Sequence, residues 1–224
     1  MLKFLMPSRT IPHTTWTASS RWDTSISRLL ILTFGLFLFG IGESLYIQSN
    51  LGNSPWAVFA DGVAKMTGTT IAWSTFAISC AVVLLWIPLK EKYGIGPIAN
   101  TIVVPWAMNV GLTFIPRQTS MTNGALFLLI GIACVGLGSA IYITCGLGAG
   151  PRQGMMTALH RITGIRVARI TTSIEVVVFT LGVLMGGKYG IGTLIFALCI
   201  GPAVAIGFTL MREIGGTPTH EHTS

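Results

Sequence analysis

The chain has 224 residues, of which 51% are hydrophobic and 9% are charged, whereas about a quarter of the residues in a soluble domain are charged. This composition excludes an ordinary soluble domain and predicts an integral membrane protein. The formal net charge of +7 does not indicate nucleic-acid binding, because no basic stripe with interleaved aromatic residues lies outside the hydrophobic segments.

The two ends of the chain are polar and are predicted to be cytoplasmic tails. Residues 1–28 contain several basic residues and lack the apolar core and small-residue cleavage site of a secretory signal. Residues 213–224 are expected to be disordered, and their His220 and His222 are expected to be solvated rather than bound to a metal.

Between the tails, six segments are apolar and long enough to cross a bilayer core of about 30 Å, which takes about 20 helical residues. These segments are Leu29–Gln48, Thr70–Leu89, Pro97–Ile115, Gly124–Thr144, Ile170–Gly186 and Gly192–Met211. The four cysteines fall inside these segments or at their ends without paired spacing, so we predict packing roles rather than disulfides or a zinc site.

The chain contains one unit twice, because a shift of 96 residues aligns the sequence with itself. From Gly35 to Pro116 this shift gives 23 identities in 82 positions without a gap. The five residues Lys92–Gly96 recur unchanged at Lys188–Gly192. We therefore predict two repeats and a linker, at residues 29–116, 124–212 and 117–123.

Each repeat also contains a short segment that begins with a proline after a glycine-rich turn. Residues 55–66 and 151–162 each reach about 18 Å as a helix, which is too short for the ~30 Å core. Both contain charged residues. We predict that they are re-entrant half-helices, because irregular backbone at membrane depth is tolerated only where it is buried in protein or lines a cavity.

Three spans in each repeat are an odd number of crossings, so the second repeat is predicted to be inverted. With the amino terminus inside, eleven of the fourteen Lys and Arg residues fall on the cytoplasmic side, as the positive-inside rule requires. Eight spans in parallel repeats would put about ten basic residues on the cytoplasmic side and four outside, which fits the rule almost as well. The choice between the two topologies therefore depends on the length and polarity of the short segments. The predicted fold is an all-α integral membrane protein with six transmembrane helices and two re-entrant half-helices in two inverted-topology repeats.

The two proline-led turns are predicted to form a solute site, because inverted-repeat transporters bind solutes near the midplane between interrupted helices. A helix that starts there presents free N–H groups and a partial positive charge, and Arg152 adds a forked cation that favours an anionic group. The alternative is that the turns only cap short helices. The predicted binding residues are Tyr46, Gly52, Ser54, Pro55, Trp56, Tyr142, Gly148, Gly150, Pro151, Arg152 and Gln153.

Two carboxylates lie within predicted spans and are candidates to carry a coupling proton, because a charge in a span is costly. Glu43 lies beside two glycines in the first span. Glu175 lies in the fifth span, where a salt bridge to Arg166 and Arg169 is an equal alternative. Asp61 is expected on the outward-facing polar side of its half-helix.

Several aromatic residues are assigned to the lipid–water interface, where such rings are enriched. Trp56 is the exception, because it occupies the repeat position of Arg152 and is assigned to the site. Tyr46 and Tyr142 are equivalent residues that either line a cavity or mark the interface. The predicted interfacial anchors are Trp73, Trp86 and Trp106.

The two turns resemble a known family. The segments LGNSPW at Leu51–Trp56 and GLGAGPRQGMM at Gly146–Met156, with G-x-G before them and GIGT afterwards, resemble the bacterial YczE-like membrane proteins, grouped with the YitT and YyaS proteins. The resemblance covers residues 28–211 and implies a multi-span, transport-related protein without naming a substrate. An aspartate commonly follows PW and GPR in the family, so Ala57 and Gln153 here imply a less acidic site.

The sequence as a whole predicts a transporter of the bacterial inner membrane that moves a small anionic or zwitterionic solute by alternating exposure of the site. Two alternatives remain: a scaffold or regulator whose cytoplasmic partner docks on Arg161, Arg166 and Arg169, and a passive anion channel. No catalytic triad, metal-ligand spacing or phosphate loop is present, so we predict no enzyme and no cofactor. The expected partners are the bilayer and the solute, with no nucleic acid and with a homodimer as a further possibility.

Overall fold

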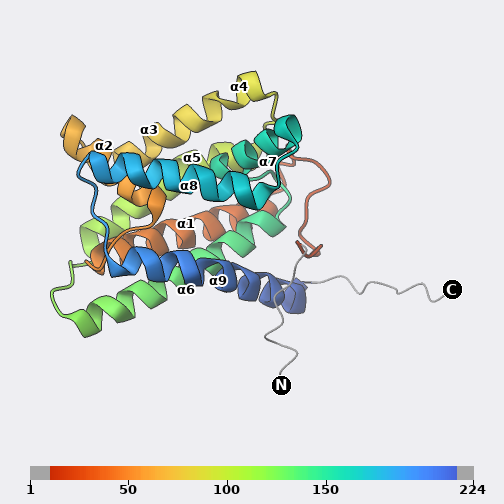
Figure 1. The fold of residues 1–224 in the computed structure, drawn as a ribbon. Helices are drawn as coiled ribbons and strands as arrows, with labels where there is room; N and C mark the ends of the chain where they lie inside the picture. The colour runs from red at the N-terminus through yellow and green to blue at the C-terminus, as the bar shows by residue number, and fades with distance from the viewer. Residues whose placement is uncertain (1–10, 216–224) are drawn as a thin grey trace.

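The computed structural model describes residues 11–215, and the predictions for His220, His222 and the ends of both tails lie outside this range. The described residues form nine helical segments (Figure 1). They are α1 Ile26–Gln48, α2 Pro55–Thr67, α3 Ile71–Leu84, α4 Trp86–Leu89, α5 Ile95–Phe114, α6 Met121–Thr144, α7 Pro151–Thr163, α8 Val167–Leu184 and α9 Ile191–Gly215.

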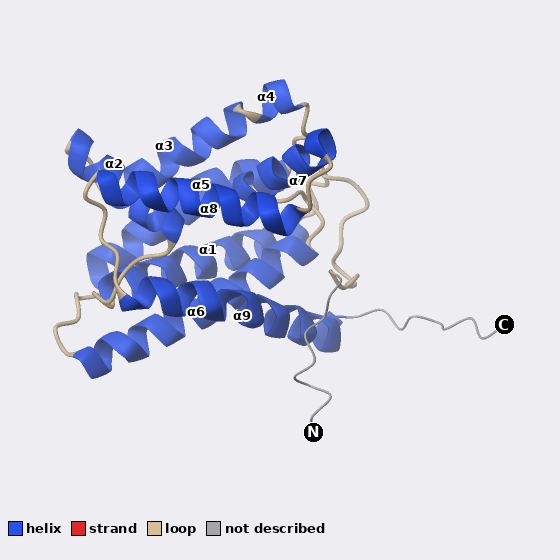
Figure 2. Cartoon of the chain, viewed as in Figure 1, coloured by secondary structure: helices blue, strands red, loops and turns tan. Residues whose placement is uncertain are grey.

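Seven of these elements form six long apolar segments, which confirm the six predicted spans. The helices α1, α5, α6, α8 and α9, together with the combined segment Ile71–Leu89, are 18 to 25 residues long and apolar enough to cross a membrane. Figure 2 shows these long helices lying roughly along one direction, with most loops gathered at the two ends. The described chain is therefore an all-α, multi-span membrane protein.

The centre of the bundle is the antiparallel pair α1 and α6, with α5 packed on α1 and α9 packed on α6 (Figure 1). Glycines bring the two central backbones together. A Cβ atom on Gly42 would lie 2.8 Å from the carbonyl oxygen of Gly131, and one on Gly138 would lie 2.6 Å from that of Gly35. Small residues at such crossings let membrane helices pack closely, which is what holds them together in the absence of a hydrophobic driving force.

Residues 96 positions apart make equivalent contacts across the bundle. The backbone N–H of Gly96 donates to the carbonyl of Leu147, and that of Gly192 donates to the carbonyl of Leu51, both at 2.9 Å. Each repeat therefore ties the start of its last span to the turn that precedes the short helix of the other repeat.

The two short helices agree in length and in the glycine at which they end, but differ in their N-terminal caps. Both have 13 residues, begin at the predicted proline and end before a glycine, Gly68 or Gly164, with a left-handed φ of 69°. Glycine adopts this φ without strain. The side chain of Ser54 caps α2 by accepting from the backbone N–H of Ala57, whereas Gly150 leaves the start of α7 without a side-chain cap.

The described part of the amino-terminal tail packs against the helical body. The backbone N–H of Thr15 donates to the carbonyl of Gly215 at 2.8 Å, and that of Ala18 donates to the carbonyl of Cys145 at 2.9 Å. Residues 11–25 are therefore an extension of the fold at the end of the bundle where α9 finishes.

Two expectations about single side chains are wrong. Trp86, expected at the interface, is 1% exposed, and its indole Nε1 donates to the carbonyl of Pro151 at 3.1 Å. Asp61, expected to face outward, is buried and accepts from the ammonium group of Lys65 at 2.9 Å and from the backbone N–H of Lys188 at 2.6 Å. Trp86 has its hydrogen-bond partner in the other repeat, and so does Asp61 for one of its two hydrogen bonds. The local sequence pattern does not reveal such partners.

Candidate functional site

A cavity of about 460 Å³ lies where the starts of α2 and α7 meet the middles of α1 and α6. This volume falls within the range of about 300–1,000 Å³ that is typical of small-molecule sites. The cavity continues along α8 as far as Val167, the first residue of that helix. It is flanked by α8 and α9, which make little or no direct contact with each other. Its polar and charged lining residues are Glu43, Ser54, Ser139, Arg152, Gln153, Thr157, Thr171 and Glu175.

Glu43 of α1 is the most deeply buried charged group of the cavity, with a side chain that is 2% exposed. One carboxylate oxygen, Oε1, accepts from the hydroxyl of Tyr46 at 3.2 Å and lies 3.9 Å from a guanidinium nitrogen of Arg152. The Tyr46 hydroxyl also lies 2.9 Å from Oγ of Ser54, the capping residue of α2. The second oxygen of Glu43, Oε2, is buried and has no hydrogen-bond partner among the described residues.

Arg152, the second residue of α7, lies between Glu43 and an aromatic face. Its guanidinium carbon is 4.8 Å from the centre of the Trp56 ring, which is a cation–π distance. Trp56 and Arg152 are repeat equivalents, so the two short helices place an aromatic ring and a cation against each other at their starts. The contact to Glu43 is loose, and the fork of five N–H donors retains free capacity toward the cavity.

A second cavity, of only about 40 Å³, lies at the repeat-equivalent positions between α3, α5 and α7. Here α3 and α5 pack directly on each other, and the hydroxyl of Thr75 lies 4.0 Å from the sulfur of Met108. Three residues, Phe39, Arg152 and Gln153, line both cavities. The small cavity is also lined by Tyr142 and Pro151 and by four residues whose repeat equivalents line the large cavity. These four are Thr75, Ser79, Asn100 and Val104, and their equivalents are Thr171, Glu175, Phe196 and Ile200, in that order.

Most of the predicted binding residues, and both of the predicted coupling carboxylates, line these cavities. Glu43, Ser54, Pro55, Trp56, Arg152, Gln153 and Glu175 line the large cavity, and Tyr142 and Pro151 line the small one. Tyr46 and Tyr142 are both 1% exposed, so they are interior residues and not interfacial ones. The hydroxyl of Tyr142 is buried, has no hydrogen-bond partner within residues 11–215 and lies beside Gly150, where a Cβ atom would be 3.1 Å from it.

Two predicted glycines shape the turns but do not line either cavity. Gly52 has a φ of 127°, and a Cβ atom there would be 2.5 Å from the backbone nitrogen of Gly190. Gly148 has a φ of 116°, and a Cβ atom there would be 2.9 Å from the ring of Pro97. Both positions therefore need glycine for conformation and close packing.

Glu175 lies on the α8 wall of the large cavity and is half-buried. No ion pair joins it to Arg166 or Arg169 among the described residues, so the salt-bridge alternative has no support in the structure. Within residues 11–215 no group of three or more His, Cys, Asp or Glu side chains is placed to hold a metal ion.

The apolar lining was not identified from the sequence. The apolar residues of the large cavity include Phe39, Val135, Phe196, Ile200 and Val204. The repeat shift contained a usable signal, because Val135 is the equivalent of Phe39 and Ser139 is the equivalent of Glu43.

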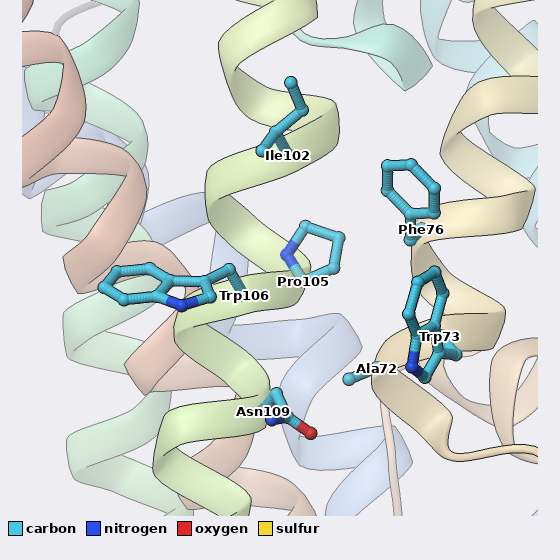
Figure 3. Close-up of a pocket in the computed structure, with 7 residues that line it drawn as sticks. All are labelled: Ala72, Trp73, Phe76, Ile102, Pro105, Trp106 and Asn109. Carbon is cyan, nitrogen blue, oxygen red and sulfur yellow. The ribbon is translucent and has the colours of Figure 1, made fainter.

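A separate groove of about 250 Å³ lies between α3 and α5 on the surface of the bundle. Figure 3 shows Trp73 and Phe76 of α3 facing Pro105 and Ile102 of α5, while Trp106 points to the other side of α5. Trp73 and Trp106 are 65% and 58% exposed, which is compatible with the interfacial positions predicted for them.

Comparisons with known proteins place these features in a wider group. A family model described as a family of unknown function (DUF6198) matches residues 26–208. An uncharacterized protein of Haemophilus influenzae is 39% identical over 210 residues, which are 94% of this chain and 96% of that protein. Two Bacillus subtilis proteins are also similar: the uncharacterized membrane protein YczE, at 27% identity over 87% of both chains, and the uncharacterized protein YyaS, at 26% over 75% of this chain and 85% of that protein. No solved structure matches the chain.

Proposed function

The chain belongs to the family of unknown function DUF6198, and from the geometry of its cavity we propose that it is a secondary transporter of a small anionic or zwitterionic solute. The family resemblance carried by the two turns is confirmed by this membership. The observation that carries the proposal is the placement of Arg152 on the ring of Trp56 and 3.9 Å from Glu43, at the starts of two short helices that line one cavity.

The proposal includes two inverted repeats. Gly35 packs on Gly138, and Gly42 packs on Gly131. The repeat shift of 96 residues carries Gly35 to Gly131 and Gly42 to Gly138, so it relates the two pairs to each other. A two-fold rotation that exchanges α1 with α6 would produce this reciprocity. Because these helices run antiparallel (Figure 1), the axis would lie perpendicular to them, in the plane of the membrane. This arrangement is typical of secondary transporters.

The proposal also treats α2 and α7 as re-entrant half-helices. Each is about 20 Å long, which is less than the ~30 Å hydrocarbon core. Each begins at the cavity in the interior, and the two lie at opposite ends of the bundle in Figure 1. The chain then continues into α3 or α8 from the end at which the short helix finishes.

Alternating exposure is supported by the unequal cavities. The large cavity extends along α8 toward one end of the bundle, and its equivalent beside α3 is nearly filled. Exchange of these two arrangements would present Arg152, which lines both, first to one side of the membrane and then to the other. Both described ends lie on the side toward which the large cavity extends, and the predicted charge distribution makes this side cytoplasmic.

Neither alternative is favoured by a specific observation. A docking surface for a cytoplasmic partner would need Arg161, but its guanidinium donates to Glu91 at 2.8 Å and to the carbonyl of Leu89 at 2.9 Å. A passive channel would need a continuous path, whereas the cavity beside α3 is almost closed.

The topology is tested with two single cysteines at equivalent exposed positions, Met66→Cys and Ile162→Cys, in a background without the four native cysteines. Re-entrant helices in inverted repeats predict that only the first is labelled by an impermeant maleimide added to intact cells. Labelling of both from the same side would overturn the inverted arrangement.

Transport is tested with purified protein in liposomes, using labelled amino acids and small carboxylates. A transporter with alternating access predicts faster uptake when the same unlabelled solute is inside, whereas a passive channel does not show this stimulation. Uptake that is unchanged by Arg152→Ala would remove the proposed site.

A further inference from the structure

The large cavity presents two opposite charges, and we infer that its solute is a small zwitterion with an N–H-bearing cationic group, a carboxylate and an apolar body. This inference rests on the proposed function, and it narrows the solute class from anion or zwitterion to zwitterion. The observations that carry it are the unpartnered oxygen of Glu43 and the loosely paired guanidinium of Arg152.

Glu43 supplies the recognition of a cation. Its carboxylate is almost completely buried, and only Oε1 has partners, at 3.2 Å from the Tyr46 hydroxyl and 3.9 Å from Arg152. A buried carboxylate oxygen without a hydrogen bond lowers the stability of the protein, so Oε2 is an acceptor that a bound solute can satisfy with an N–H donor. An ammonium N–H satisfies this oxygen and also compensates its charge.

Arg152 supplies the recognition of an anion. The guanidinium is held from one side by the face of Trp56 and lies 3.9 Å from Glu43, beyond hydrogen-bond distance. Its planar fork of donors matches a carboxylate in two parallel bonds. A phosphate-like dianion would fit the fork as well, but it would place a second negative charge beside the buried Glu43.

Charge balance selects a zwitterion over either single ion. Glu43 and Arg152 together are neutral, so a bound anion would satisfy Arg152 and leave the Glu43 charge uncompensated, and a bound cation would do the reverse. Leaving the buried carboxylate of Glu43, which is only 2% exposed, without a charge partner is strongly unfavourable. A zwitterion adds no net charge and pairs with both groups.

The dimensions favour charges that are close together. In an α-amino acid the ammonium nitrogen and a carboxylate oxygen are about 3 Å apart, because both groups are bonded to one carbon. The free Oε2 of Glu43 belongs to the same carboxylate as Oε1, which lies 3.9 Å from a guanidinium nitrogen of Arg152, so two charges on one carbon can reach both groups. The rest of the lining includes Phe39, Phe196 and Ile200, so the remainder of the solute is expected to be apolar.

The experiment measures binding of three matched sets to the purified full-length protein in detergent by titration calorimetry. Each set contains an amino acid and the two compounds that keep its side chain but lose one charge. The sets are L-alanine, ethylamine and propionate; L-leucine, 3-methylbutylamine and 4-methylpentanoate; and L-phenylalanine, phenethylamine and 3-phenylpropionate. We expect at least one amino acid to bind at least about tenfold more tightly than both of its single ions, as the loss of one charge pairing implies.

Two substitutions identify the groups responsible. Glu43→Gln keeps the shape and removes the negative charge, so the advantage of the amino acid over its carboxylate should fall below about threefold. Arg152→Gln should remove its advantage over the amine in the same way. Glu213→Gln, which changes an exposed carboxylate at the end of α9, is the matched control and should preserve both ratios.

The outcomes separate this inference from the transport proposal. If no amino acid binds, or if one of the two single ions binds as tightly as its amino acid in every set, the zwitterion inference is overturned. Uptake of the carboxylate that still depends on Arg152 would then leave the transport proposal standing. Tight amino acid binding without stimulated uptake in liposomes would support the zwitterion site and overturn transport.

Discussion

The two cavities beside α8 and α3 are built from equivalent positions, yet one holds about 460 Å³ and the other about 40 Å³. In the second repeat α8 and α9 stand apart, whereas in the first repeat α3 and α5 are in contact, with Thr75 against Met108. The equivalent of Met108 is the smaller Val204, which lines the large cavity.

This difference shows how a duplicated unit can hold two arrangements at once. The sequence repeat supplies two similar helix–helix boundaries, here called seams: one between α3 and α5 and the other between α8 and α9. Both seams pack around the same shared residues, and the seam at α8 is open while the seam at α3 is filled. Phe39, Arg152 and Gln153 line both cavities, so they cannot account for the difference in volume between them.

The short helices are held differently on the two sides. The start of α7 carries Gly154, and a Cβ atom there would be only 2.0 Å from the ring of Trp86. The equivalent of Trp86 is Gly182, which instead lets the backbone of α2 approach α8, since a Cβ atom there would be 2.6 Å from the nitrogen of Phe59. The helix α7 is thus held by the Trp86 side chain packed on its glycine, whereas the backbone of α2 packs directly on a glycine of α8.

The largest expected effect comes from the shared residue Arg152. Arg152→Ala removes the cation proposed to bind the solute carboxylate and leaves the buried Glu43 without its charge partner, so the rate of stimulated amino acid uptake should fall about 100-fold or more, which corresponds to about 2.7 kcal/mol. Arg169→Ala, at an exposed position of α8, is the matched control and should stay within about twofold. Equal losses in both variants would show that the shared site is not the centre of function.

The contact between Trp86 and Gly154 should contribute the next largest effect. Gly154→Val forces a side chain into the indole ring and is expected to destabilise the protein by about 1–3 kcal/mol in detergent unfolding. Combining it with Trp86→Gly should give a double variant that is more stable than the sum of the single changes implies. Gly201→Val is the control, because nothing lies within 4 Å of its added Cβ atom. Strict additivity would contradict the direct contact.

The closed seam can be opened at Met108. Met108→Ala removes the side chain that contacts Thr75, so a cysteine introduced by Thr75→Cys should be labelled about tenfold faster in the variant, which corresponds to about 1.4 kcal/mol in the opening equilibrium. The equivalent cysteine from Thr171→Cys, in the large cavity, should be labelled rapidly with or without the change. Protection of both cysteines would show that the large cavity is not accessible.

The smallest expected effect is that of Glu175. Its side chain is half-buried and makes no ion pair among residues 11–215, so Glu175→Gln should change uptake by about 1 kcal/mol or less, or roughly fivefold. Its equivalent Ser79 lines the small cavity, and Ser79→Ala is the comparison variant. A loss as large as that of Arg152→Ala would assign Glu175 an essential part in coupling.

Much of the fold could be predicted because the relevant signals are local. The spans follow from apolar length, and both short helices begin at the predicted proline and end one residue later than predicted. The meeting of the two helix starts was also predicted, since Trp56 and Arg152, which follow Pro55 and Pro151, lie against each other. Trp86 was mispredicted because its partner lies in the other repeat, and composition around a residue does not identify such a partner.

The sequence by itself determined the membrane class, the six spans, the duplication and the two proline-led helix starts, because each depends on the order of residues within one segment or on their repetition. Only the tertiary structure decided that Glu43 and Arg152 share a cavity and that the seam beside α3 is filled while its equivalent beside α8 is open. The physical reason is that these features depend on the fit of side chains across the two repeats, as where Met108 contacts Thr75 beside α3 while its equivalent Val204 lines the open cavity beside α8.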